Sequence, residues 1–321
     1  MVPSMSMNQS VLICDQVAHI LNDILQKNGL KISYEPEISP EQIKEKIGNF
    51  DIVIVRSRTK ITKEMIDSAS KCKIIARVGV GLDNIDVDAA KAKGIRVINA
   101  VEGAMNAVAE LVLGLMLSLA REIPRADGEI RLGKWPKKNL MGIELSGKYL
   151  GIVGLGNIGK KLARHARALN MNIIGYDVIP IPDDFTREVG LVKTDIDTLL
   201  SSADFISFHV PLTESTYHLV NKEKFSKMKK TAYIINTSRG EIIDEVALIH
   251  ALKEGKIAGA ALDVREEEPD PSADAAVAKN ELAQLTNVIS TPHIGAQTKE
   301  AQALAANVIA EKIIMILRGV I

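Results

Sequence analysis

Three glycines spaced G-x-G-x-x-G constrain the fold more than any other feature of the chain. Gly154, Gly156 and Gly159 follow the apolar run 149–153, which has the length of a buried strand, and open a helical pattern that continues to about 169. The first glycine permits a tight turn, the second leaves the backbone open to a pyrophosphate, and the third lets the helix pack against the strand. N–H groups at the start of the helix then face the phosphates. This order of strand, turn and helix indicates a dinucleotide-binding domain.

A carboxylate closes the next predicted strand. Residues 172–176 are followed by Asp177, which lies eighteen positions beyond Gly159. That spacing is close to the one at which an acidic residue binds the ribose diol of NAD. The three residues after Asp177 supply no cation, so a 2′-phosphate would meet an uncompensated negative charge. The pattern therefore predicts NAD as the cofactor.

Strand and helix patterns alternate on both sides of the glycine motif. The first series has strand patterns at 11–14, 31–33, 51–55, 73–77 and 96–98. The second has them at 149–153, 172–176, 205–210, 232–236, 259–264 and 288–291. Strict alternation implies parallel sheets with right-handed crossovers. We therefore expect an α/β fold with two Rossmann-like or flavodoxin-like, doubly wound parallel-sheet domains and a cleft between them.

Two long helical patterns set the expected domain boundaries. Residues 102–121 are nearly all apolar, which predicts a buried helix, whereas 125–146 reads as a polar connection. A last helix at about 298–317 is expected to return to the first domain through an apolar stripe made of Ala301, Leu304, Ala305, Val308, Ile309 and Ile316. We expect a discontinuous substrate-binding domain (1–100 and 297–321) and an NAD-binding Rossmann domain (101–296).

Composition limits the classes of partner. Among the 321 residues, Lys plus Arg equals Asp plus Glu at 40 each, so no overall basic field favours nucleic acid or membrane. The longest apolar stretch, 107–120, contains Glu110 and is too short to span a bilayer. The two cysteines, Cys14 and Cys72, cannot form a disulfide framework and suggest a reducing, cytoplasmic environment. No His, Cys, Asp or Glu group has metal-ligand spacing, so no metal is expected.

Ligands of an open parallel sheet lie beyond the carboxyl ends of its strands. In the second series this rule selects the glycine turn, Asp177, Val210-Pro211, the segment 237–240, the segment 265–269 and the segment 292–295. In the first series it selects Arg56-Ser57-Arg58 and the segment 79–81. An arginine, carboxylates and a histidine are thus expected beside the nicotinamide site.

Hydride transfer between NAD and an alcohol needs a base for the hydroxyl proton and a group that binds the substrate. His293 is the candidate base, because imidazole titrates near neutral pH. Glu268, ahead of Glu267 and Glu266, is the candidate carboxylate on its other ring nitrogen. Arg239 can bind a 2-hydroxy or 2-oxo carboxylate through its planar guanidinium. The alternative is a structural histidine beside a solvated acidic turn.

The remaining histidines favour structural roles. His209 lies in a predicted strand and is expected to be a core residue with a hydrogen-bond partner. The others fall on or beside predicted helices and are interpreted as surface or packing residues: His19, His165, His218 and His250.

Longer motifs, together with the glycine turn, resemble the D-isomer-specific 2-hydroxyacid dehydrogenase family. They are His-Val-Pro-Leu-Thr at 209–213, Asn-Thr-Ser-Arg-Gly at 236–240, Ala-Leu-Asp-Val at 261–264 with Glu-Glu-Pro at 267–269, and Pro-His-Ile-Gly-Ala at 292–296. The resemblance covers essentially the whole chain. Within the family, the segments 133–135, 141–148 and 293–302 are most similar to D-3-phosphoglycerate dehydrogenases.

The resemblance implies a function for named positions. It implies Arg239, Glu268 and His293 as the catalytic set, and an NAD site containing Asn157, Ile158, Asp177, Val210, Thr237, Ser238 and Asp263. The strand-end rule adds the neighbouring Pro211 and Gly295, and Ala296 completes the motif 292–296 as a further candidate for the NAD site. The resemblance further implies that Val80 and Gly81 offer backbone N–H groups to the substrate carboxylate. It also implies a homodimer formed through the 102–121 helix and the Trp135 segment.

A cluster of cations suits a phosphorylated substrate. Arg56, Arg58 and Lys60 lie at or just after a strand end, and Lys137 or Lys138 could reach in from a second subunit. Ordinary surface cations are the alternative. The hypothesis is NAD-dependent oxidation of D-3-phosphoglycerate to 3-phosphohydroxypyruvate, the entry step of L-serine biosynthesis. The competing hypotheses are a glyoxylate, hydroxypyruvate or D-lactate-type reductase, and an NAD-sensing corepressor-like protein, which the neutral charge balance disfavours.

Two positions depart from the family pattern. Ala107 stands where serine is common before Val-Ala-Glu, and Arg265 stands where an aromatic residue is usual. Both are expected near the cleft, so they bear on substrate details. The chain ends at Ile321 without the carboxyl-terminal regulatory domain of many phosphoglycerate dehydrogenases. Serine feedback through such a domain is therefore not expected.

Overall fold

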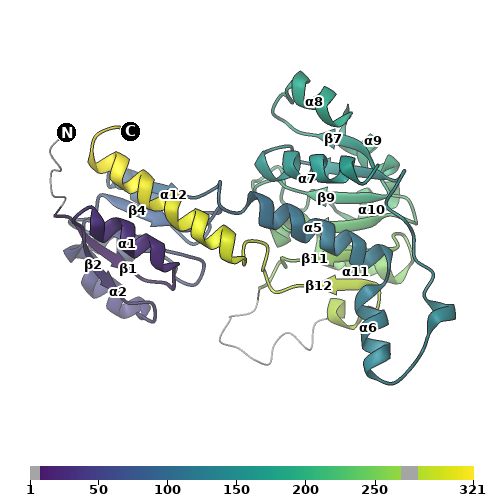
Figure 1. Cartoon of the computed structure of the whole chain (residues 1–321), viewed down its shortest axis with the longest axis horizontal. Coiled ribbons are helices and arrows are strands. Elements are labelled where there is room, and N and C mark those ends of the chain that lie inside the picture. Colours follow the sequence, from purple (N-terminus) through teal and green to yellow (C-terminus); the bar gives the residue numbers. More distant parts are fainter. Residues whose placement is uncertain (1–7, 269–280) are drawn as a thin grey trace. The chain divides into compact units, whose positions relative to one another are not determined.

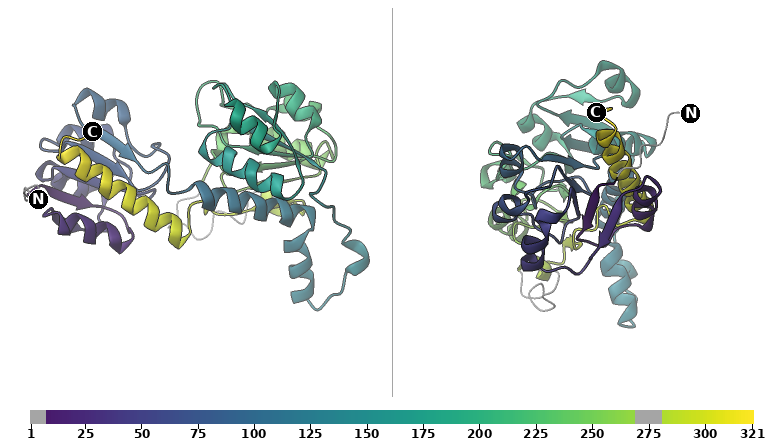
Figure 2. Two further views of the ribbon diagram at one scale, coloured as in Figure 1. Left: turned by 45° about the horizontal axis from the view of Figure 1, so that its top comes forward. Right: turned by 90° about the vertical axis from the view of Figure 1, so that its left-hand side faces the viewer.

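The computed structural model describes residues 8–268 and 281–321 and divides into two compact units. Unit 1 consists of Met1–Met105 and Ala296–Ile321, and unit 2 of Asn106–Gly295. Each unit contains one parallel sheet with helices packed on both faces (Figures 1 and 2). The predicted fold class, two parallel-sheet α/β domains, is confirmed.

The sheet of unit 1 has the strand order β2-β1-β3-β4-β5. Its strands are β1 (Ser10–Ile13), β2 (Lys31–Tyr34), β3 (Ile52–Val55), β4 (Ile74–Arg77) and β5 (Arg96–Asn99). Side chains alternate between its faces. Val11 packs toward α1 (His19–Lys27) and α12 (Lys299–Leu317), whereas Leu12 packs toward α2 (Pro40–Lys46), α3 (Lys63–Ser68) and α4 (Val87–Ala92). The order reverses between β1 and β3, and their carboxyl ends form a switch point of the kind at which ligands bind.

The last helix, α12, lies beside α1 on unit 1, as Figure 1 shows in yellow and purple. Its buried face differs from the expected stripe. Leu304 is 46% exposed, while Ala306, Ala310, Ile313 and Ile314 are buried in addition to Ala301, Ala305 and Ile309. Because α12 packs on α1 and also on β4 and β5, its buried face is wider than one stripe.

The sheet of unit 2 has the strand order β12-β11-β10-β9-β6-β7-β8. Its strands are β6 (Tyr149–Val153), β7 (Asn172–Tyr176), β8 (Val192–Lys193), β9 (Phe205–Phe208), β10 (Tyr233–Asn236), β11 (Gly259–Leu262) and β12 (Val288–Ser290). The order reverses between β6 and β9. Because β9 and β11 end earlier than predicted, His209 and Asp263 belong to loops beyond the strand ends.

Helices cover both faces of this sheet. One face packs on α5 (Met105–Ala120), α7 (Asn157–Ala168) and α8 (Asp183–Val189), and the other on α9 (Ile196–Ser202), α10 (Lys222–Lys227) and α11 (Glu245–Lys253). Alternating apolar residues of the strands explain this division, since Ile235 contributes to the first core and Ile234 to the second. None of the helices in the described ranges is long and apolar enough to cross a membrane.

The interpretation of 125–146 as a polar connection is wrong in part, because α6 occupies Ile123–Arg131. The helix buries none of its side chains, although Ile123, Ala126 and Ile130 recur at helical spacing. Ion pairs at helical spacing also support it, Arg125 with Glu122 and Arg131 with Asp127. Figure 2 shows α6 projecting from the rest of unit 2.

Candidate active site

The glycine turn between β6 and α7 is shaped by close contacts within the backbone. Gly154 has φ 92°, a conformation that glycine adopts without strain, and a Cβ there would lie 2.6 Å from the carbonyl oxygen of His209. A Cβ on Gly159 would lie 2.1 Å from the carbonyl oxygen of Gly154. The turn itself therefore requires glycine at both positions.

Gly156 is different, because a Cβ there would meet no described atom within 4 Å. It is the N-cap of α7, which has neither a side-chain cap nor an acidic residue in its first turn among the described residues. The first N–H groups of α7, beginning at Asn157 and Ile158, therefore remain available to an anion. An open position over free N–H groups fits the pyrophosphate of a dinucleotide.

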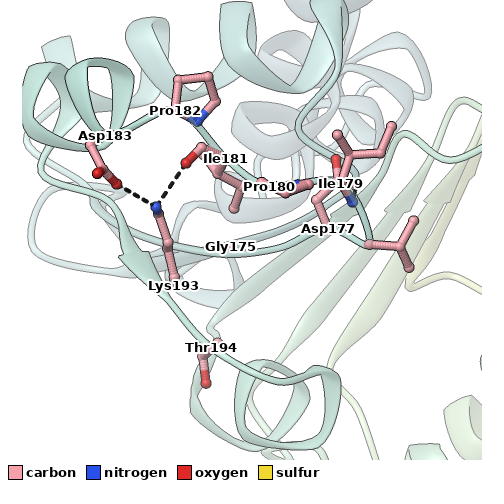
Figure 3. Close-up of a pocket in the computed structure, with 10 residues that line it drawn as sticks. Gly175, Asp177, Ile179, Pro180, Ile181, Pro182, Asp183, Lys193 and Thr194 are labelled. Atoms are coloured by element: carbon pink, nitrogen blue, oxygen red, sulfur yellow. Dashed lines mark hydrogen bonds and ion pairs between the residues drawn. The ribbon is translucent and has the colours of Figure 1, made fainter.

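Asp177 lies beyond the carboxyl end of β7, on the wall of a hollow of about 520 Å³ (Figure 3). Its carboxylate accepts the backbone N–H of Leu155 at 2.6 Å and that of Ile179 at 2.9 Å. Asp177 therefore joins the glycine turn to the start of the next loop. The place of this carboxylate fits the ribose of a bound dinucleotide.

Lys193 of β8 lines the same hollow and was missed by the sequence reasoning, which considered only the residues directly after Asp177. Figure 3 shows its ammonium group donating to the carbonyl oxygen of Ile181 at 2.7 Å and to the Asp183 carboxylate at 2.8 Å. Asp183 thus balances the charge of Lys193. The pairing of β8 with β7 brings Lys193 into the hollow that Asp177 also lines. No local sequence pattern predicts this contact.

The loop after β10 offers a second sign of a ligand. The hydroxyl oxygen of Thr237 is buried without a hydrogen-bond partner in the described part of the chain. A buried hydroxyl left in this state costs about 1–3 kcal/mol. Asn236 shapes the loop, since its side chain accepts from the backbone N–H and hydroxyl of Ser238. A bound group that pairs with Thr237 would remove the cost, so this loop also fits a cofactor.

His293 and Glu268 lie within hydrogen-bond distance of each other. Nδ1 of His293 is 2.9 Å from Oε1 and 3.0 Å from Oε2 of Glu268. This hydrogen bond raises the pKa of His293 above its ordinary value, although burial and the positive charge of Arg239 act against it. The negative charge of Asp263 acts in the same direction as Glu268. Since Nδ1 is engaged by Glu268, Nε2 is the ring nitrogen that remains for a further partner.

Asp263 fixes the loop that carries His293. Its carboxylate, 1% exposed, accepts from the backbone N–H groups of Ile294 at 2.9 Å and Gly295 at 2.8 Å, and from the hydroxyl of Thr291 at 2.5 Å. The backbone N–H of His293 donates to the carbonyl oxygen of Asp263 at 2.9 Å. These bonds hold His293 at φ 53°, which is uncommon for a residue with a side chain. Asp263 therefore acts on this site by positioning the imidazole.

Arg239 lies on the loop after β10, and its backbone carbonyl accepts from the Asn236 side chain at 2.8 Å. A Cβ on the next residue, Gly240, would lie 1.9 Å from the carbonyl carbon of Arg265. The Arg239 loop and the segment leading to Glu268 are therefore in direct backbone contact. The three predicted catalytic residues follow the neighbouring strands β10, β11 and β12 of one sheet.

The predicted cation cluster of unit 1 includes an arginine engaged in packing. Nε of Arg58 donates to Asp15 at 3.0 Å, and its guanidinium also donates to the carbonyl oxygens of Cys14 at 2.5 Å and Pro36 at 2.8 Å. The Asp15 carboxylate, which is almost wholly buried, also accepts from the hydroxyl of Thr59 at 2.8 Å. Arg58 therefore stabilises the fold of unit 1 by joining Asp15 to the backbone of Cys14 and Pro36, a role that the sequence did not predict.

The other candidates in unit 1 also follow strand ends. Arg56, after β3, donates to the carbonyl oxygen of Gln16 at 3.1 Å, and burial lowers the pKa of its guanidinium. Ser57 is exposed, while Val80 and Gly81, after β4, are partly exposed. The position of these groups beyond β3 and β4 agrees with the strand-end rule.

His209 has the hydrogen-bond partner expected of it, but it lies in a loop, where it is only partly exposed to solvent, and not in the core of the sheet. Its Nε2 lies 2.9 Å from the hydroxyl of Ser207, and burial lowers its pKa to about 4. His218, interpreted as a surface or packing residue, is partly exposed and pairs with Glu266. Within the acidic run 266–268, Glu266 therefore pairs with His218 and Glu268 pairs with His293.

Unit 2 has the fold and the open glycine turn of a dinucleotide-binding domain of the dehydrogenase class. Residues 113–295 match the family described as D-isomer specific 2-hydroxyacid dehydrogenase, NAD binding domain. The chain belongs to the D-isomer-specific 2-hydroxyacid dehydrogenase family.

Three relatives illustrate the range of the family. A D-3-phosphoglycerate dehydrogenase of Methanocaldococcus jannaschii is 47% identical over 310 residues, covering 96% of this chain and 57% of the relative, so the chain spans little more than half of that protein. A hydroxypyruvate reductase of Thermotoga maritima is 46% identical, covering 90% of this chain and 92% of the relative. The crystal structure of D-lactate dehydrogenase from Aquifex aeolicus, complexed with NAD and lactic acid, superposes with a TM-score of 0.83 at 29% identity, covering 97% and 96% of the two chains.

Proposed function

We propose that the protein catalyses NAD-dependent oxidation of D-3-phosphoglycerate to 3-phosphohydroxypyruvate, the entry step of L-serine biosynthesis. The observation that carries this proposal is the hydrogen bond between His293 and Glu268 on loops at the carboxyl edge of the dinucleotide-binding sheet. The substrate is supported by the similarity to the M. jannaschii protein of that name.

The side chains divide the work as follows. Nε2 of His293 takes the proton of the substrate hydroxyl, and Glu268 stabilises the imidazolium that results. Arg239 binds the substrate carboxylate through its guanidinium. When bound, NAD accepts the hydride from the carbon that carried the hydroxyl. In the reverse direction His293 returns the proton.

We propose that NAD is held by the loops beyond the strand ends of unit 2. The residues are Gly154, Gly156, Asn157, Ile158, Gly159, Asp177, Val210, Pro211, Thr237, Ser238, Gly295 and Ala296, with Asp263 in support. Two observations favour this set: the open position of Gly156 at the start of α7, and the buried, unpartnered hydroxyl of Thr237 among the described residues. NAD is preferred to NADP because of the carboxylate of Asp177.

For the substrate, we propose that Val80 and Gly81 contribute backbone N–H groups, and that Arg56 and Ser57 bind the phosphate. Arg58 acts on this region by fixing the end of β1, since its guanidinium is engaged by Asp15. The experiment is a comparison of kcat/KM for D-3-phosphoglycerate and D-glycerate. Wild type should prefer the phosphorylated acid, and Arg56→Met should reduce that preference.

Hydroxypyruvate or glyoxylate reduction is the second candidate function. The observation that favours it is the T. maritima hydroxypyruvate reductase, which matches over nearly its whole length. A panel of 2-hydroxy and 2-oxo acids with and without phosphate decides between the two. Equal kcat/KM with and without phosphate would remove the phosphoglycerate assignment and leave the reductase.

We also propose a homodimer formed through α5 and the segment around Trp135. The side chains that favour it are apolar and exposed: Leu117, Ile123, Ile130, Leu132, Trp135 and Met141. Sedimentation velocity of wild type and Trp135→Ala tests this arrangement. Wild type should sediment as a dimer, and the variant should shift toward the monomer; a monomeric wild type would contradict it.

A further inference from the structure

The segment 265–268, which carries Glu268, is tied to the body of unit 2 by an ion pair that the proposed chemistry does not use. Nε of Arg265 lies 2.9 Å from Oε2 of Glu245, and Nη2 lies 2.5 Å from Oε1. The two side chains are only 12% and 18% exposed. Two parallel hydrogen bonds from one guanidinium fix both distance and orientation. Arg265 is therefore attached firmly to the first turn of α11.

The next residue is tied to a different element. Glu266 pairs with Nε2 of His218, and the ring of His218 stacks on Tyr217 with centroids 4.1 Å apart. His218 adopts φ 47°, and its backbone N–H donates to the carbonyl oxygen of Glu241 at 2.8 Å. The histidine is thus held from its backbone and from its ring. It offers Glu266 a fixed partner.

A third restraint on the segment 265–268 is a backbone contact with the loop that carries Arg239. Gly240, next to Arg239, lies so close to the backbone of Arg265 that a Cβ on it would be 1.9 Å from the Arg265 carbonyl carbon and 2.4 Å from the backbone nitrogen of Glu266. The segment rests directly on the Arg239 loop. It therefore has no room to shift toward that loop.

Glu268 and His293, in contrast, receive little restraint from their own packing. Their side chains are 45% and 48% exposed. Exposed partners lose conformational entropy when they stay paired, and such pairs contribute little stability by themselves. The distance between the two side chains must therefore be set by the backbone segments that carry them. Misplacement of a catalytic group by about 1 Å can lower the rate of a reaction on the order of a hundredfold.

We infer that the pairs Arg265–Glu245 and His218–Glu266, here called the anchor pairs, are positioning residues that hold the segment 265–268 so that Glu268 stays within hydrogen-bond distance of His293. Their effect on catalysis rests on the proposed function. Their effect on the His293 environment rests on geometry alone. This role also explains an arginine at 265, where the family pattern favours an aromatic residue.

The test measures the pKa of His293 by NMR titration of the full chain, with His293→Asn used to assign its signal. The groups that set this pKa are Glu268, Asp263 and Arg239. Arg265→Met should lower the pKa in the same direction as Glu268→Gln. Removal of a nearby positive charge would by itself raise it, so a fall reports the loss of geometry. Glu266→Ala should also lower the pKa, but loss of its negative charge would by itself have that sign, so Arg265→Met is the variant that decides.

The matched control is Arg164→Met. Arg164 makes a similar two-point pair with Glu188 elsewhere in unit 2, with distances of 2.5 and 2.8 Å. This variant should leave the pKa of His293 and the turnover unchanged. The anchor-pair variants should lower kcat by on the order of tenfold to a hundredfold with NAD affinity unchanged.

A charge exchange between Arg265 and Glu245 distinguishes loss of the ion pair from unfolding of the protein. The double variant Glu245→Arg with Arg265→Glu should recover part of the lost kcat and of the His293 pKa. A folded Arg265→Met protein with the wild-type His293 pKa would overturn the inference. If wild type oxidises no 2-hydroxy acid, the proposed function fails, while the NMR titration still decides whether the anchor pairs position Glu268.

Discussion

Nδ1 of His293 lies 2.9 Å from Oε1 of Glu268, and the two residues follow the adjacent strands β12 and β11. The pairing engages Nδ1, leaves Nε2 as the other ring nitrogen, and raises the pKa of the imidazole. Asp263 holds the histidine in place, and by our inference the anchor pairs hold the glutamate. The exposed His293–Glu268 pair thus has neighbours that are less exposed than it is: Asp263 is buried and the anchor pairs are partly buried.

The first prediction concerns pH. In the proposed mechanism oxidation requires neutral His293, so kcat for oxidation should rise with pH through the pKa of this imidazole, whereas kcat for reduction should fall through the same pKa. Because the Glu268 hydrogen bond raises that pKa, Glu268→Gln should move the oxidation profile to lower pH. The measurement is kcat against pH in both directions. An unshifted profile would exclude Glu268 as the partner of the titrating group.

Two glycine substitutions separate binding from folding. Gly156→Ala should leave the thermal midpoint close to wild type, because the added Cβ meets no described atom, and should weaken NAD binding. Gly159→Ala forces a Cβ to 2.1 Å from the Gly154 carbonyl oxygen and should lower stability by about 1–3 kcal/mol or more. Calorimetric melting and NAD titration supply the two readouts. Wild-type NAD affinity in Gly156→Ala would mean that no pyrophosphate lies over this position.

Asp177 should set the choice between the two nicotinamide cofactors. Asp177→Ala removes the charge opposed to a 2′-phosphate and the partner of a ribose diol. The ratio of the NADP and NAD dissociation constants should therefore fall. Fluorescence titration with both cofactors measures that ratio. An unchanged ratio would mean that Asp177 does not determine the preference between NAD and NADP, and Lys193 would then be the next residue to test.

Arg58 should contribute to stability. Arg58→Met leaves the buried Asp15 carboxylate without its guanidinium partner and should lower the free energy of unfolding by about 1–2 kcal/mol. Arg56→Met is the matched control, with a smaller effect on stability and a larger one on KM for the phosphorylated acid. Urea unfolding and steady-state kinetics give both quantities. If the two variants exchange these effects, Arg58 is the phosphate ligand.

The sequence predicts well those features that depend on residues close together along the chain. Apolar runs and turn residues indicate the strands of both sheets except the short β8, and the glycine spacing predicts the turn after β6. The strand-end rule selected Glu268 and His293, which the structure brings together. The supports were missed because they depend on contacts between distant residues: Arg265 with Glu245, His218 with Glu266, and Asp15 with Arg58. The helix α6 was missed because its charged residues were interpreted as a polar connection, and none of its side chains is buried.

The most direct measurement follows deuterium from C2 of D-3-phosphoglycerate into NADH by mass spectrometry, in wild type and in His293→Asn. Wild type should transfer the label completely, and the variant should transfer it about 10²- to 10⁴-fold more slowly with an unchanged NAD dissociation constant. NADH formed without the label, or equal rates in the two proteins, would contradict the proposed reaction and the role of His293.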